Sequence, residues 1–93
     1  MKVTIIVPVY NTEKELNKTL DSLVNQTYPN IEILIINDGS TDNSEKIIQQ
    51  YQEKYKNIVY YAKSNTGVAD TRNFGIRQSN RRLYIICRFG WLY

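Results

Sequence analysis

The sequence predicts an α/β protein in which helices cover both faces of a parallel sheet. Four short apolar runs recur along the chain, at residues 3–9, 31–36, 58–61 and 83–87. Polar segments with apolar residues at helical spacing lie between them, and turn-forming residues separate the two kinds of segment. This alternation is typical of a three-layer fold with right-handed crossovers. With 93 residues, the chain is predicted to form one small domain with a sheet of about four strands and a marginal core.

The first predicted strand covers residues 3–9, because its residues are mostly apolar and β-branched, as in a strand buried on both faces. Pro8 lacks an N–H group, so it should lie at the end of the strand or on an unpaired edge. Thr12 and Glu15 have the spacing of a capping box, which predicts a helix start. This helix should cover residues 13–25, with one apolar stripe formed by Leu16, Leu20, Leu23 and Val24.

The second predicted strand covers residues 31–36 and ends in small and acidic residues. We expect Asn37 to Ser40 to stop it, because Gly39 tolerates positive φ and Asn, Asp and Ser bond their own backbone in turns. Asp38 should therefore lie at the carboxyl end of a central strand. In open α/β sheets, ligands bind at that edge.

The remaining elements follow the same alternation. Asp42 and Glu45 repeat the capping-box spacing, and a helix over residues 43–55 is expected, with an apolar face of Ile47, Ile48, Tyr51 and Tyr55. Residues 58–61 form the third predicted strand. A polar turn at residues 63–67 leads to a helix that begins near Val68 and carries Val68, Arg72, Gly75 and Ile76 at helical spacing. The run at residues 83–87 then gives a fourth strand.

Two of these strand ends carry side chains that suit a flat, polar ligand. If the first two strands are neighbours, Tyr10 and Asp38 share one rim, where an aromatic face and a carboxylate could hold a base with N–H donors. Tyr10 could instead pack on a helix, and Asn37 and Asp38 could be turn formers only. Arg72 could meet a phosphate or a carboxylate at the rim, or it could form a structural ion pair with Asp38 or another acid.

Three segments resemble the signatures of the inverting, GT-A-type family 2 glycosyltransferases. They are Val7-Pro8-Val9-Tyr10-Asn11, Asn37-Asp38-Gly39-Ser40-Thr41-Asp42, and Ser64–Ala69 with Thr71–Gly75. Their order and spacing match the family over about Lys2 to Asn80. The resemblance implies a Rossmann-like GT-A nucleotide-diphospho-sugar transferase fold, present as an incomplete, donor-binding N-terminal portion.

The resemblance also implies a function and a set of site residues. The family transfers a sugar from a nucleotide-sugar, most often a UDP-sugar, to an acceptor, which for this chain would be a growing polysaccharide or another glycan or lipid-linked molecule. Asp70 departs from the small residue that the family usually has, but Asp is tolerated in a first helical turn. The positions implied to bind the nucleotide-sugar are Pro8, Val9, Tyr10, Asn11, Asp38, Asn65, Gly67 and Arg72.

The resemblance breaks after the fourth strand. There the family has an Asp-x-Asp motif that holds Mg²⁺ or Mn²⁺, and further on a carboxylate that serves as catalytic base. This chain has Cys87-Arg88-Phe89-Gly90 instead, with no carboxylate. Cys87 suits a hard cation poorly and Phe89 is no ligand. Arg88 could neutralise phosphate but would not reproduce a metal site, so we expect no bound metal, no base and an inactive fragment.

The genetic code offers an explanation for this break. When codons permitted for Arg81 to Gly90 are read one nucleotide later, they can give Gly-Asp-Tyr-Ile-Leu-Phe-Val-Asp-Ser-Asp, a strand followed by an Asp-x-Asp. We therefore hypothesise a frameshift near Asn80, natural or from sequencing. Residues 1–80 would be the nucleotide-binding part, and residues 81–93 a divergent tail.

Composition excludes several other classes. The chain has no histidine, no Gly-x-Gly-x-x-Gly after the first strand and no Gly-Lys-[Ser/Thr] loop, which argues against His-based sites, dinucleotide oxidoreductases and P-loop NTPases. The single cysteine forms no internal disulfide, and no run reaches the roughly 20 apolar residues of a membrane span. A cytoplasmic location, or one at the inner face of the membrane, is expected.

Charge is unevenly distributed. The net charge is +3, every arginine lies at or after Arg72, and no acidic residue follows Asp70. Such a tail could attract nucleic acid or an anionic membrane, but a solvated face is favoured, and no nucleic-acid partner is expected. A non-catalytic nucleotide-binding module, or a pseudogene product, remains the alternative function. An unrelated α/β interaction domain is disfavoured by the paired signatures.

Overall fold

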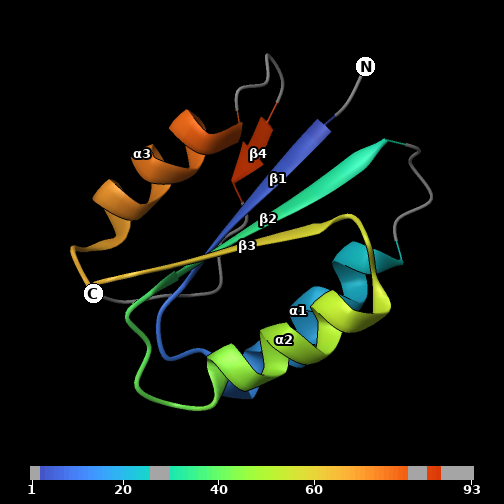
Figure 1. The fold of residues 1–93 in the computed structure, drawn as a ribbon, viewed down its shortest axis with the longest axis horizontal. Coiled ribbons are helices and arrows are strands. Elements are labelled where there is room, and N and C mark those ends of the chain that lie inside the picture. Colours follow the sequence, from blue (N-terminus) through green and yellow to red (C-terminus); the bar gives the residue numbers. More distant parts are fainter. Residues whose placement is uncertain (1–2, 26–29, 80–83, 87–93) are drawn as a thin grey trace.

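The computed structural model describes residues 3–25, 30–79 and 84–86 as one parallel sheet with helices on both sides. Its strands follow the order β3-β2-β1-β4, and every neighbouring pair is parallel. The predicted alternation and strand number are confirmed. Figure 1 shows the elements, which are β1 (Val3–Val9), α1 (Glu13–Val24), β2 (Ile31–Asp38), α2 (Ser44–Lys54), β3 (Ile58–Lys63), α3 (Val68–Ser79) and β4 (Tyr84–Ile86).

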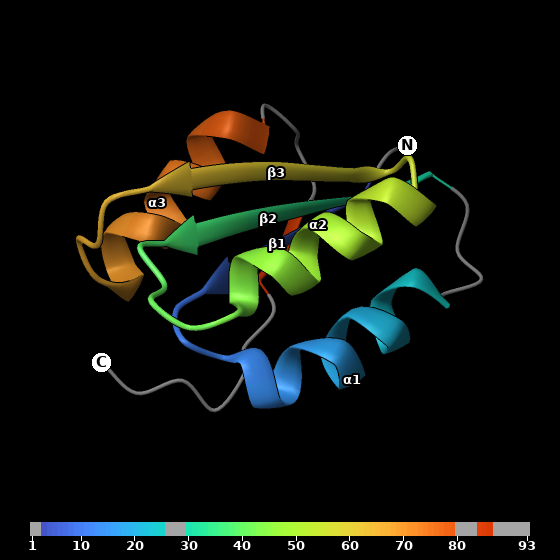
Figure 2. The same ribbon diagram turned by 60° about the horizontal axis from the view of Figure 1, so that its bottom comes forward.

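Helices α1 and α2 cover one face of the sheet and α3 covers the other, so the fold has three layers (Figure 2). The strand order explains this arrangement. The chain moves from β1 through β2 to β3 in one direction, then crosses back past both to β4. Since crossovers are right-handed, reversing the direction places the connecting helix on the opposite face. The reversal creates a topological switch point between β1 and β4, where open α/β sheets favour ligand binding.

The core is divided between the two faces by the alternation of side chains along β1 and β2. One set of buried residues packs with α1 and α2, and it includes Ile5, Val7, Ile33 and Ile35. The other set packs with α3 and consists of Ile6, Leu34 and Ile36. Both faces of these strands are therefore apolar, which accounts for the continuous apolar runs in the sequence.

The second strand is longer than predicted. Asn37 and Asp38 were expected to end it, but β2 continues through both, because Asn37 pairs with Ala62 and Asp38 with Lys63 in the ladder to β3. The turn begins only at Gly39, which has a φ of +74°. Pairing with a neighbouring strand outweighs the local turn preference of these residues.

Pro8 agrees with its predicted place. It is the next-to-last residue of β1 and stands opposite Ile36 of β2. Within the described residues, the pairing of β1 with β4 covers only Thr4 to Ile6. The missing N–H of Pro8 therefore leaves the described ladder to β4 intact.

The two predicted capping boxes are wrong. Thr12 and Asn43 are the N-cap residues of α1 and α2, and neither makes a side-chain cap hydrogen bond. One carboxylate serves both helices instead. Oδ2 of Asp42 accepts the Glu13 N–H at 3.2 Å and Oδ1 accepts the Ser44 N–H at 2.9 Å.

Helix α3 lies very close to the sheet at Gly75. A Cβ atom there would lie 2.6 Å from Ile36 Cδ1 and 2.6 Å from Ile6 Cγ2. Beside this contact, Phe74 packs edge-on against Tyr61, with ring centroids 5.6 Å apart. Gly75 is thus required for packing.

No helix in the described part of the chain has the length and apolar character needed to cross a bilayer.

Candidate functional site

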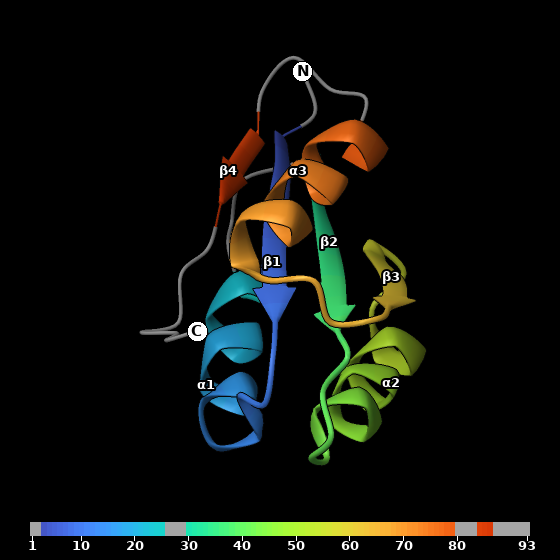
Figure 3. The ribbon, with the colours of Figure 1, turned by 90° about the vertical axis from the view of Figure 1, so that its left-hand side faces the viewer.

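The carboxyl ends of β1, β2 and β3 meet at one edge of the sheet, visible in Figure 3 as three arrowheads at the same end. Val9 pairs with Asn37 in the register of β1 and β2, so Tyr10 and Asp38 follow at the same level. The prediction that these two residues share one rim is confirmed. Tyr10 is half-buried, whereas Asp38 is buried.

Asn11 ties the turn after β1 to the loop after β2. Its Oδ1 accepts hydrogen bonds from the Thr41 N–H at 2.8 Å and the Asp42 N–H at 3.3 Å, and its own N–H donates to Ser40 Oγ at 3.0 Å. Its φ is +51°, which Asn tolerates better than most residues. Asn11 thus shapes the rim through its hydrogen bonds with the neighbouring loop.

Asp38 is bound to the loop after β3. Its Oδ1 lies 2.7 Å from Lys63 Nζ and accepts the Thr66 N–H at 3.0 Å, while Oδ2 accepts the Gly67 N–H at 3.2 Å. Sequence reasoning considered Arg72 as an ion-pair partner and missed Lys63. Nε of Arg72 is buried without a hydrogen-bond partner in the described part of the chain.

The loops after β2 and β3 are packed backbone to backbone. A Cβ atom at Gly39 would lie 2.8 Å from Asn65 N, so only glycine fits. Gly67 has a φ of +102°, and its carbonyl accepts the Thr71 N–H at 3.0 Å at the start of α3. Gly67 therefore directs the chain into the helix, and Asn65 is exposed at the rim.

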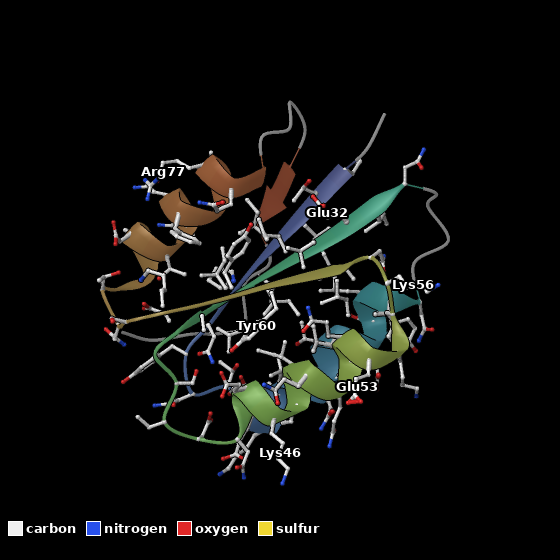
Figure 4. All side chains as sticks on the ribbon, in the orientation of Figure 1. Glu32, Lys46, Glu53, Lys56, Tyr60 and Arg77 are labelled. Carbon is white, nitrogen blue, oxygen red and sulfur yellow. The ribbon has the colours of Figure 1, made fainter. Side chains whose placement is uncertain are left out.

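A second group missed by the sequence reading connects β2, β3 and α2. Asn37 accepts the Ser40 N–H at 3.0 Å and donates to the Tyr60 hydroxyl at 3.1 Å, which donates to Glu45 Oε2 at 3.0 Å. Figure 4 shows Tyr60 between β3 and α2. Burial and Glu45 raise the pKa of Tyr60 while the Asn37 bond lowers it, and the net shift is upward. Tyr60 is thus a neutral donor.

Comparison with known proteins identifies the family. Residues 4–87 match the profile of Glycosyl transferase family 2. The chain belongs to glycosyl transferase family 2. The resemblance of its three signature segments to that family is thereby confirmed.

The relatives include a Poly(ribitol-phosphate) beta-glucosyltransferase of Bacillus spizizenii, 51% identical over 61 residues, which are 63% of this chain and 10% of the relative. The structure of S. aureus TarS 1–349 in complex with UDP-GlcNAc superposes with a TM-score of 0.84 at 31% identity, covering 92% of this chain and 26% of that 1–349 chain. A mannosyltransferase from Pyrobaculum calidifontis, in complex with GDP-Man and Mn²⁺, gives a TM-score of 0.77 at 26% identity, covering 83% and 24%.

The chain therefore corresponds to a small part of longer proteins, since it spans 9% to 31% of the length of eight curated relatives that it matches. The two solved structures hold different nucleotide-sugars, UDP-GlcNAc in TarS and GDP-Man in the mannosyltransferase.

In the part of the chain that the structure describes, no group of side chains fits the divalent metal that the resemblance implies. The described residues contain no cluster of three or more His, Cys, Asp or Glu side chains that could hold an ion. Cys87, Arg88 and Phe89 lie outside the described residues, and their side chains offer no carboxylate for Mg²⁺ or Mn²⁺.

Asp42 should make folding of this family 2 chain sensitive to acid. Burial raises the pKa of its carboxyl group, but hydrogen bonds from Ser44 and Glu13 outweigh it and hold the pKa below 3.8. A carboxylate with a lowered folded-state pKa stabilises the fold above its unfolded pKa, and this stabilisation is lost as pH falls through the folded value.

We expect Asp42→Ala to lower the free energy of unfolding by about 1–2 kcal/mol at neutral pH, since both α1 and α2 lose a helix-terminal acceptor. The difference from the unmodified chain should shrink once the pH falls below 3.8. Urea unfolding at neutral and strongly acidic pH measures it, with Glu53→Ala, at an exposed position of α2, as the control. A difference that stays constant with pH would contradict the assignment.

Proposed function

We propose that this chain is the donor-binding portion of a family 2 glycosyltransferase, and that it holds a nucleotide-sugar, a UDP-sugar, at the carboxyl rim of the sheet. The observation that supports the proposal most is that the three family-like segments meet in space. The segments 7–11, 37–42 and 64–75 are far apart in the sequence, and parts of all three lie at one rim beside the switch between β1 and β4.

Each proposed donor-site residue has a role that its surroundings support. The Tyr10 ring offers a stacking face for the base. Asp38 lies beneath the turn 64–67 as the carboxylate at the base of the site. Asn65 is the exposed polar side chain of that turn, and the Arg72 guanidinium is proposed for the diphosphate. The other proposed donor-site residues shape the backbone that holds these side chains in place, and they are Pro8, Val9, Asn11 and Gly67.

The substrate class follows the relatives. TarS is in complex with UDP-GlcNAc, which supports a uridine nucleotide. The Bacillus relative carries poly(ribitol-phosphate) in its name, which supports a polymeric acceptor, with another glycan or a lipid-linked molecule as the other option. A reducing, cytoplasmic setting is part of the same proposal, because the single cysteine forms no internal disulfide.

We further propose that the chain binds its donor without Mg²⁺ or Mn²⁺ and does not transfer the sugar. Cys87-Arg88-Phe89 replaces the Asp-x-Asp, and a frameshift near Asn80 would explain the replacement. On this proposal residues 1–80 are the nucleotide-binding part, and residues 81–93 the divergent tail. A non-catalytic nucleotide-binding module has the same support, because the missing carboxylates affect transfer and leave the rim unchanged.

Nucleotide binding should depend on Tyr10. We expect Tyr10→Ala to weaken UDP binding by about 1–3 kcal/mol, roughly five- to 150-fold, because base stacking on an aromatic ring contributes that much. Isothermal titration calorimetry with UDP measures the effect. Tyr10→Phe is the matched control, because it keeps the ring and should keep the affinity. Equal affinity of Tyr10→Ala and the unmodified chain would reject the stacking role, and no UDP binding by the unmodified chain would reject the proposed function.

A further inference from the structure

Lys63 connects three parts of the rim with one ammonium group. Its Nζ lies 2.7 Å from Asp38 Oδ1 at the end of β2. It also donates to the Ser64 carbonyl at 2.9 Å, to Thr66 Oγ1 in the turn, and to Thr71 Oγ1 in α3 at 3.5 Å. One side chain therefore joins a strand end, the turn after β3 and the following helix.

The carboxylate that Lys63 contacts binds the same turn through the backbone. Asp38 accepts the N–H groups of Thr66 and Gly67 at 3.0 and 3.2 Å. In the same turn, Asn65 packs against Gly39, where an added Cβ atom would lie 2.8 Å from Asn65 N. The turn is thus held by hydrogen bonds to Asp38 and by close packing against Gly39.

The ion pair of Lys63 and Asp38 is buried, which makes its loss costly for the fold. The Asp38 side chain exposes none of its surface and that of Lys63 only 14%. Water therefore cannot replace the ammonium easily, and removing it would leave a buried carboxylate without its cation. A turn held this way is ordered before any ligand arrives, so a ligand that touches it does not have to order it.

We propose that Lys63 is a positioning residue, which latches the turn 64–67 to Asp38 and so preforms that side of the donor site. This role adds detail to the proposed function. Only the identity of the ligand depends on that proposal, whereas the contacts of Lys63 do not. Lys63 acts through Asp38 and the turn, and its own hydrogen bonds are directed to protein oxygens.

The test compares Lys63→Met with Lys56→Met. Lys56 is an exposed lysine just before β3, at the opposite end of that strand from Lys63 (Figure 4). Hydrogen exchange followed by NMR should show the Thr66 and Gly67 amides exchanging at least about tenfold faster in Lys63→Met, because their acceptor is no longer fixed. Exchange of the Ile35 amide, in the centre of β2, should change much less, and Lys56→Met should change none of the three.

Nucleotide affinity provides the second measurement. UDP should bind Lys63→Met at least about fivefold more weakly, since the ligand must now order the turn. Lys63→Arg keeps the charge and the ion pair, and should recover most of the protection and affinity. Should Lys63→Met fail to fold, Lys63→Gln, which keeps an N–H donor but not the charge and leaves both Asp38 oxygens in place, should show the same faster exchange at Thr66 and Gly67.

Unchanged exchange at Thr66 and Gly67 overturns the latch, and so does an equal increase at all three amides, which indicates general destabilisation. Faster exchange at the turn with unaltered UDP affinity overturns the positioning role. If the unmodified chain binds no UDP, the proposed function fails, and the exchange rates alone decide whether the latch exists.

Discussion

A Gly75→Val variant should lose a large part of the stability of the chain. The added Cβ would lie 2.6 Å from both Ile6 Cγ2 and Ile36 Cδ1, and neither isoleucine has any exposed surface into which it could move. Overpacking of this kind costs about 1–3 kcal/mol and occasionally more. Valine also adds two methyl groups beyond that Cβ, so we expect a loss of about 3 kcal/mol, against a typical total of about 5–15 kcal/mol.

Urea unfolding measures this loss, and the same helix provides a matched control. Asn73 is exposed on α3, and Asn and Val have similar helix propensities, so Asn73→Val should change the free energy of unfolding by no more than about 0.5 kcal/mol. Similar unfolding midpoints for the Gly75→Val variant and the unmodified chain would show that α3 does not lie as close to the sheet as described.

No sugar transfer is expected from the chain with its present residues 87–90, with or without Mn²⁺. Departure of the nucleoside diphosphate places negative charge on its oxygens, and in the family a metal held by two carboxylates neutralises that charge. Such stabilisation is worth several kcal/mol, and each 1.36 kcal/mol is about tenfold in rate. Cys87 and Phe89 cannot supply it, so the rate should be at least about a thousandfold lower than that of an intact relative.

Release of UDP from a UDP-sugar measures the reaction. Resequencing the gene through the codons for residues 78–93 and beyond tests the frameshift hypothesis directly. A protein made from the frame read one nucleotide later should then regain Mn²⁺-dependent hydrolysis or transfer, and Asp-to-Asn changes in its recovered motif provide the control. Robust turnover by the chain with Cys87-Arg88-Phe89-Gly90 unaltered would show that the proposed loss of the metal site is wrong.

The parts of this fold that sequence reasoning predicted are those governed by local pattern. Runs such as Ile33–Ile36 are apolar because both faces of the strand are covered, so the runs predict buried parallel strands. The shared rim of Tyr10 and Asp38 followed from the same reasoning, since adjacent parallel strands end at the same edge. These predictions needed no knowledge of side-chain partners.

The parts that were missed depend on partners far away in the sequence. Asp42 caps a helix that begins 29 positions earlier, and Asp38 binds N–H groups 28 and 29 positions later. Lys63 followed a strand-like run and carried no motif of its own. The capping-box spacings were misleading, because tertiary bonds to Asp42 took the place of the local ones.

The position of β4 has a consequence for the order in which the chain assembles. Thr4 of β1 pairs with Tyr84 of β4, so one edge of β1 stays unpaired until a strand about 80 residues later has been made. The other pairs are closer in sequence, because Val3 pairs with Ile31 and Ile33 pairs with Ile58. Closing the longest loop costs the most entropy, which favours β4 joining last, during synthesis as well as in refolding. Tyr10, Asp38 and Lys63 lie at the carboxyl ends of the three strands that pair first. Residues altered by a frameshift near Asn80 would therefore leave the ribosome after those strands. The rim that the three strands form would keep its sequence and could assemble first.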